Sequence, residues 1–71
     1  MMKAILSQEK ADKPDEYHEV GMSHRTVVEG SRRQIVARAQ EYREHMHCRV
    51  RVQLFHRERF YAPEPLETFY V

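Results

Sequence analysis

The 71-residue sequence has one cysteine, two glycines and no tryptophan, and it contains no long apolar run. A single cysteine excludes an internal disulfide framework and fits a reducing compartment. Two glycines that lie far apart exclude a glycine-rich phosphate-binding loop. The apolar stretch near the N-terminus is too short for a signal peptide, and it falls well below the roughly 20 residues that span a bilayer. We therefore expect a cytoplasmic protein with no membrane partner.

The amino-acid composition is that of a small globular domain. Hydrophobic residues make up 41% of the chain and charged residues 32%, whereas a disordered chain would combine low hydrophobicity with high charge. A length of 71 residues is near the lower limit at which an apolar core can hold a fold. We expect residues 1–71 to form one domain.

Positive charge is concentrated in the middle of the chain. Residues 22–60 contain nine arginines and four glutamates, a balance of +5, whereas residues 1–21 and 61–71 each have a balance of −2. Arginine presents a planar fork that pairs with carboxylate or phosphate groups through two hydrogen bonds, which lysine cannot do. A basic binding surface is therefore the first functional hypothesis. An ordinary solvated surface balanced by nearby glutamates is the alternative.

One helix is clearly indicated. Ser31 and Gln34 have the spacing of a capping box, in which each side chain bonds the backbone amide of the other residue. Behind this box, apolar residues recur at the helical period. They are Ile35, Val36, Ala39, Tyr42 and Met46. The pattern predicts an amphipathic helix over residues 32–46.

The residues before the helix predict two strands. Residues 2–8 are typical of a short strand, and residues 9–16 are charged and contain Pro14, so we expect them to form an exposed loop. A β-branched run at the end of residues 17–29 indicates a second strand, in which Gly21 could mark a bulge.

After the helix the apolar period changes from 3.6 to 2. Cys48, Val50, Val52 and Leu54 alternate with Arg49, Arg51 and Gln53, which predicts a strand over 48–54 with one face on the core and one in water. The alternation breaks at Phe55, so we expect a turn at 56–59 and a returning strand from Phe60. Pro63 and Pro65 then interrupt, and residues 62–71 form a tail or an edge strand.

These elements predict an α+β fold in the order β-β-α-β-β. A single amphipathic helix would pack on an antiparallel sheet of about three to five strands, burying its apolar stripe and one sheet face together. An exposed edge strand could also pair with that of a second copy, so a homodimer remains open.

The histidines do not predict a metal site. His45, His47 and Cys48 lie at the junction of helix and strand, and His56 follows later, but zinc sites usually pair their ligands as CxxC or HxxxH. The two helix-end histidines interact favourably with the carbonyl end of a helix. We expect no metal and no cofactor. We also expect no enzyme, because no spacing suggests a catalytic triad and so small a fold leaves little room for a pocket.

The arginines are the candidate binding residues. Arg32 and Arg33 occupy the first helical turn, where each cation destabilises the helix by roughly a few tenths of a kcal/mol. Residues that weaken the local structure in this way are often retained for function. Arg49 and Arg51 share one strand face, and Tyr61 follows the turn that holds the last two arginines. The predicted contact set is Arg32, Arg33, Arg49, Arg51, Arg57, Arg59 and Tyr61. Such a face could grip an acidic protein, bind single-stranded nucleic acid, or be a plain solvated surface.

The order of elements resembles that of small proteins that bacteriophages use to disable host machinery. The stretches MKAILSQEK (2–10), SRRQIVARAQE (31–41) and CRVRVQLFHRERFY (48–61) are similar in layout to a type I-F anti-CRISPR protein. The stretch RTVVEGSRRQIVARAQEYREHMHCRVRV (25–52) also resembles the small RNA polymerase inhibitor of T7-like phages. No diagnostic motif is shared, so no family residue carries over. The resemblance implies a non-catalytic phage or mobile-element inhibitor that docks on a host protein or ribonucleoprotein complex. Direct nucleic-acid binding by the same arginines is the alternative.

Overall fold

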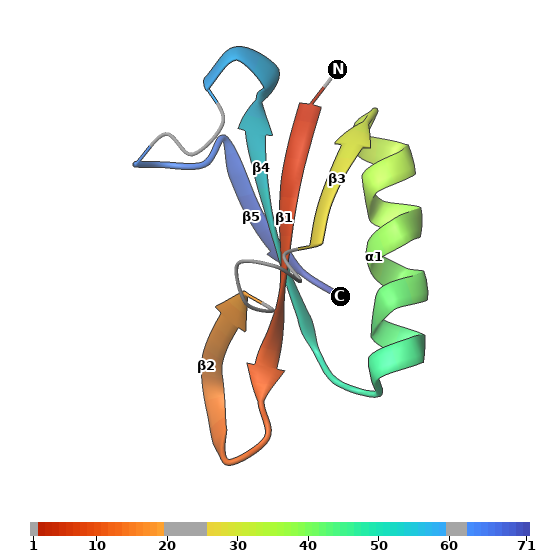
Figure 1. Ribbon diagram of the computed structural model, residues 1–71, viewed down its shortest axis with the longest axis vertical. Coiled ribbons are helices and arrows are strands. Elements are labelled where there is room, and N and C mark those ends of the chain that lie inside the picture. Colours follow the sequence, from red (N-terminus) through yellow and green to blue (C-terminus); the bar gives the residue numbers. More distant parts are fainter. Residues whose placement is uncertain (1, 20–25, 60–62) are drawn as a thin grey trace.

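The computed structural model describes residues 2–19, 26–59 and 63–71, and it has the predicted α+β fold (Figure 1). The order of its elements is consistent with β-β-α-β-β, with the residues before the helix divided among three strands. The elements are β1 (Met2–Lys10), β2 (Lys13–Glu19), β3 (Thr26–Gly30), α1 (Arg32–Met46), β4 (Val50–His56), the 3-10 turn η2 (Arg57–Arg59) and β5 (Glu67–Tyr70).

Strand β1 organises the antiparallel sheet, whose order is β2-β1-β4-β5. One edge of β1 pairs with β4 along residues 2–8. The other edge pairs with β3 along residues 2–6 and then with β2 from Ser7 onward. A nine-residue strand thus serves three partners, and β3 and then β2 pair with the same edge of β1. In Figure 1, where the sheet twists, β3 lies to the right of the upper part of β1 and β2 to the left of its lower part.

The prediction of an exposed loop at 9–16 is wrong. Strand β1 continues to Lys10, and β2 begins at Lys13 after a tight turn. These charged residues bury little, but pairing in a hairpin requires only backbone hydrogen bonds and leaves the side chains in water. Pro14 is compatible with this arrangement because β2 lies at the edge of the sheet. The predicted strand over 17–29 is therefore two strands, and Gly21 lies outside the described residues.

The helix begins and ends where the sequence predicts. The Ser31 hydroxyl accepts a hydrogen bond from the Gln34 amide at 3.2 Å, and the Gln34 side-chain oxygen accepts one from the Ser31 amide at 2.9 Å. Gly30 precedes the cap with φ +149°, and a Cβ there would lie 2.6 Å from that same Gln34 oxygen. The helix ends at His47, whose left-handed backbone (φ 55°) closes the last turn.

The main core lies between α1 and the sheet. Its buried residues come from β1, α1 and β4: Ala4, Leu6, Ile35, Ala39, Val50, Val52 and Leu54. Tyr42 and Phe69 pack at its margin. The predicted inward positions of β4 are thus confirmed, whereas Met46, the last residue of the helical stripe, is exposed.

The sheet face turned away from α1, which we call the far face, is not simply solvated as predicted. Phe55 is only 4% exposed and lies on this face, so residues are buried on both faces at this end of β4, and the strand continues to His56 beyond its predicted end at Leu54. Ile5 and Ser7 of β1 are also buried, and Arg51 is half-buried. The sheet curls, and Leu66, in the chain before β5, lines one hollow together with Phe55.

The predicted turn at 56–59 is present over Arg57–Arg59 as η2, whereas His56 is the last residue of β4. The predicted returning strand at Phe60 and Tyr61 lies outside the described residues. Strand β5 closes the sheet beside β4 as an edge strand.

Candidate binding site

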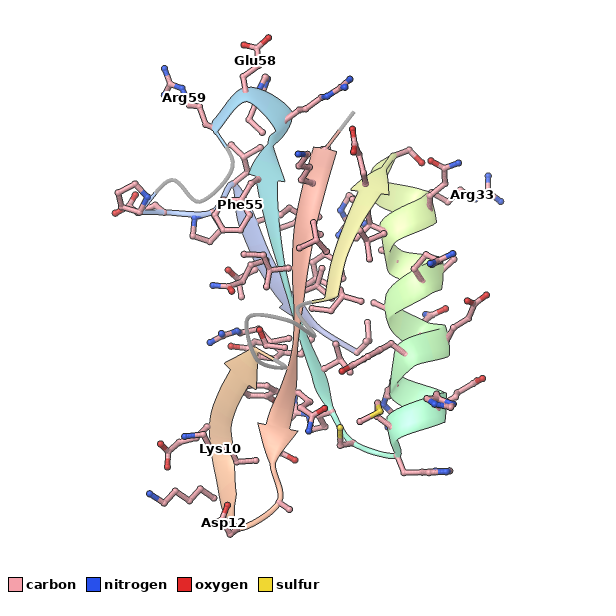
Figure 2. All side chains as sticks on the ribbon, viewed as in Figure 1. Lys10, Asp12, Arg33, Phe55, Glu58 and Arg59 are labelled. Carbon is pink, nitrogen blue, oxygen red and sulfur yellow. The ribbon has the colours of Figure 1, made fainter. Side chains whose placement is uncertain are left out.

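The predicted contact residues do not form one surface. Arg32 and Arg33 lie at the start of α1, whereas Arg49 directly precedes β4 and Arg51 is its second residue. The arginines of η2, Arg57 and Arg59, follow the opposite end of β4. At about 3.3 Å per residue, the six residues from Arg51 to Arg57 span roughly 20 Å. In Figure 2, Arg33 and Arg59 project outward from different elements. Tyr61 lies outside the described residues.

Arg32 is paired within the fold, although its side chain is 51% exposed. Its guanidinium donates two hydrogen bonds to Glu67, from Nη2 to Oε1 at 2.8 Å and from Nε to Oε2 at 3.1 Å. The same group lies 4.9 Å from the centre of the Phe69 ring. These contacts tie β5 to the start of α1, so the unusual arginine in the first helical turn has a structural reason.

Arg57 is also paired within the fold. Its Nε lies 3.3 Å from Oε1 of Glu29, the residue before Gly30 in β3. The pair is well exposed, so it contributes little to stability. It nonetheless leaves the Arg57 guanidinium less available for a partner than the sequence suggests.

The Arg32–Glu67 pair gives stability a specific pH dependence. The hydrogen bond from Arg32, opposed by desolvation, lowers the pKa of Glu67 below its ordinary value of 4.5. A carboxylate with a lowered folded-state pKa stabilises the fold above its unfolded pKa, and this contribution is lost as the pH falls through the folded value. We expect Glu67→Gln to be less stable than the natural chain at pH 7, with the difference shrinking below about pH 4.5.

Urea midpoints of both proteins between pH 7 and pH 3 measure this difference. The matched control is Glu44→Gln, which changes an exposed glutamate of α1 that pairs with no described residue. A difference that stayed constant across this range would contradict the proposed role of the pair.

A second group of residues gathers on the far face: Tyr17, Arg49, Arg51 and Tyr70, which we call the Arg–Tyr cluster. The Tyr17 and Tyr70 rings lie 5.3 Å apart at an interplanar angle of 48°. The Arg51 guanidinium lies 5.6 Å from the centre of the Tyr17 ring, and that of Arg49 lies 5.7 Å from the centre of the Tyr70 ring. Both separations are within the range of cation–π attraction.

The curl of the sheet makes this cluster possible. Tyr17 belongs to β2 and Tyr70 to β5, and β1 and β4 lie between these strands. In a flat sheet, three strand spacings would separate their backbones by about 14 Å. Ring centres only 5.3 Å apart therefore require the two tyrosines to lean toward each other across the curled far face.

Arg51 has an unusual environment for a cation. One of its terminal nitrogens, Nη2, donates to the buried Ser7 hydroxyl at 3.4 Å. Its Nε is buried and has no hydrogen-bond partner among the described residues. An unpartnered buried donor costs about 1–3 kcal/mol, more when charged. Stability alone therefore does not explain an arginine at this position.

Sequence reasoning missed both tyrosines of the cluster. Tyr17 was placed next to a predicted loop and Tyr70 in a predicted tail or edge strand. The two lie near opposite ends of the chain, so no local pattern could have paired them. The sequence hinted only that aromatic residues could flank the arginine-rich strand, and it did not indicate which tyrosines these are.

The structure does not bring together the histidines and the cysteine that the sequence analysis considered and set aside as metal ligands. His47 and the half-buried Cys48 follow α1, whereas His56 lies at the other end of β4, where its Nδ1 accepts from the Glu58 amide at 3.4 Å. Across residues 2–19, 26–59 and 63–71, no three His, Cys, Asp or Glu side chains form a group that could hold a metal ion.

Comparisons with protein-family models, with curated proteins and with solved structures found no match to this chain. The candidate site therefore depends on the chemistry of its own residues. In the part of the chain that the structure describes, no helix has the length and apolar character needed to cross a membrane.

Proposed function

We propose that the chain is a small non-enzymatic binding protein that docks on an acidic partner through the Arg–Tyr cluster. The observation that carries the proposal is the joining of two arginines and two tyrosines from separate strands on one face. Arginine and tyrosine are among the residues that most often anchor protein interfaces. Tyr70 is 50% exposed and Arg49 is exposed, so both can reach a partner.

The partner's chemistry follows from the charge of the cluster. No carboxylate among the described residues pairs with Arg49 or Arg51. A carboxylate group on a partner would supply charge-assisted hydrogen bonds that the fold itself does not provide. In line with the resemblance to phage inhibitors, the proposed partner is a host protein or ribonucleoprotein complex in the host cytoplasm, which the chain would inhibit by occupying its surface.

Direct binding of single-stranded nucleic acid is the second candidate. Half-exposed aromatic rings beside guanidinium groups are suited to stack bases and contact phosphates. The formal net charge of +1 and the isoelectric point of about 8.0 argue against it, because dedicated nucleic-acid binders usually exceed pI ~9.

A pull-down from bacterial lysate, with and without nuclease, separates the two candidates. A partner retained after nuclease treatment supports docking on protein. Loss of the captured material, together with an affinity for a single-stranded oligonucleotide that falls steeply with salt, supports nucleic-acid binding instead.

Arg49→Glu tests the surface itself. This exposed change should weaken binding of the captured partner by about tenfold or more while leaving the melting temperature unchanged. The matched control is Arg33→Glu, the same charge reversal on α1, which should retain binding. Equal losses in the two variants would show that general positive charge, rather than the Arg–Tyr cluster, binds the partner.

A further inference from the structure

Strand β3 leaves one edge of the sheet open. It pairs with β1 and, within the described residues, with no other strand. Its sequence TVVEG has neither proline nor lysine, the residues that commonly protect an exposed edge. Val27 is 41% exposed, and the single charge of the strand, on Glu29, is engaged by Arg57. Nothing in the strand itself therefore opposes pairing with a further strand.

A groove runs beside this edge, between β3 and α1. It consists of two hollows of about 550 and 440 Å³ that share Val27, Val28 and Arg38. Apolar side chains from all three neighbouring elements line it, including Leu6, Ala37 and Tyr42. Arg38 and Glu41 line it from the side of α1. An open strand edge next to an apolar groove is a surface that a further strand and helix could cover together.

We propose that β3 pairs antiparallel with β3 of a second copy of this chain, forming a two-fold symmetric dimer with one continuous sheet. A two-fold interface must be complementary to itself. Antiparallel pairing of β3 about such an axis places both copies of α1 on the same side of the joined sheet, next to each other. The open backbone groups of each β3 then gain partners. Val28, which faces α1, is covered by the adjoining helices, whereas Val27, which lies opposite Ile5 on the far face, is shielded by the neighbouring strand.

The charges on α1 favour a second copy over an unrelated strand. Arg38 and Glu41 lie one turn apart on the flank of α1 that lines the groove, and they carry opposite charges. When a two-fold axis relates the two copies, Arg38 of each copy faces Glu41 of the other, so that two such pairs form. The flank is thus complementary to itself, as a symmetric interface requires. This dimer uses no residue of the Arg–Tyr cluster, which comes from β2, β4 and β5.

Sedimentation equilibrium tests the dimer. We expect the natural chain at micromolar to submillimolar concentration to reach about twice its monomer mass of 8.6 kDa. Val27→Lys places a charge on the open edge and should give a folded monomer, with an unchanged circular dichroism spectrum. Leu66→Lys is the matched control, since Leu66 is 63% exposed and lies before β5, and this variant should stay dimeric. A natural chain that is monomeric throughout, or a Val27→Lys variant that remains dimeric, overturns the proposal.

Charge reversal tests the two-fold arrangement independently of Val27. Arg38→Glu alone and Glu41→Arg alone should each weaken dimerisation on the order of tenfold, because like charges then face each other across the axis. The double variant Arg38→Glu with Glu41→Arg should restore the affinity of the natural chain. If the double variant is no better than the single ones, the two residues do not face each other and the proposed pairing is wrong.

Discussion

Replacing Ile35 with alanine is expected to lower the free energy of unfolding by about 3 kcal/mol, the usual range for a buried isoleucine being about 2–5 kcal/mol. Ile35 is 0% exposed and joins α1 to the sheet; among the residues that the structure describes, the core cluster has seven buried members, two of which are alanines. A chain of this length has a total stability of about 4–11 kcal/mol, at roughly 0.05–0.15 kcal/mol per residue. The substitution should therefore remove a large share of the stability.

Urea denaturation followed by far-UV circular dichroism measures the loss. The matched control is Val36→Ala, at the next position of the same helix, where the side chain is only half-buried. It should cost less than about 1 kcal/mol, because alanine recovers helix propensity. Equal losses at the two positions would show that Ile35 is not the residue through which α1 packs on the sheet.

The helix is the element that the sequence predicted best, because its signals are local. The capping box needs only Ser31 and Gln34, three positions apart, and the apolar period needs only the residues of the helix itself. Both signals were confirmed in the bounds Arg32–Met46 and in the burial of Ile35 and Ala39. The α+β fold followed from this helix and from the alternating strand after it.

The hairpin of β1 and β2 could not be predicted from its own residues. Residues 9–16 are charged and have little to bury, and their conformation depends on backbone pairing with a long central strand. The burial of Phe55 was not predicted, for a related reason. A strict period of 2 suggested one buried face, whereas the curled sheet buries residues on both faces, and curl is a property of the whole sheet.

The candidate site shows the same division between local and long-range information. The sequence identified arginine as the residue of interest, but composition does not reveal which guanidinium groups the fold already uses. Arg32 finds Glu67, and Arg57 finds Glu29, through contacts between distant segments. The cationic surface of the candidate site is therefore smaller than predicted. It also includes two tyrosines, Tyr17 and Tyr70, that were not among the predicted contact residues.

Replacing Arg51 with methionine should weaken binding of the captured partner by about a hundredfold, roughly 2.7 kcal/mol, while leaving the fold at least as stable. Methionine has a similar length, packs favourably against the Tyr17 ring and removes the buried Nε that lacks a described partner, and these gains compensate for the loss of the 3.4 Å hydrogen bond from Arg51 to the Ser7 hydroxyl. Thermal unfolding and titration with the partner measure the two effects separately. Gln53→Met, the same change at the next residue on this face of β4, should leave binding unaltered. If Arg51→Met instead destabilises the chain, the arginine is retained for folding; if it binds as the natural chain does, the Arg–Tyr cluster is not the docking surface.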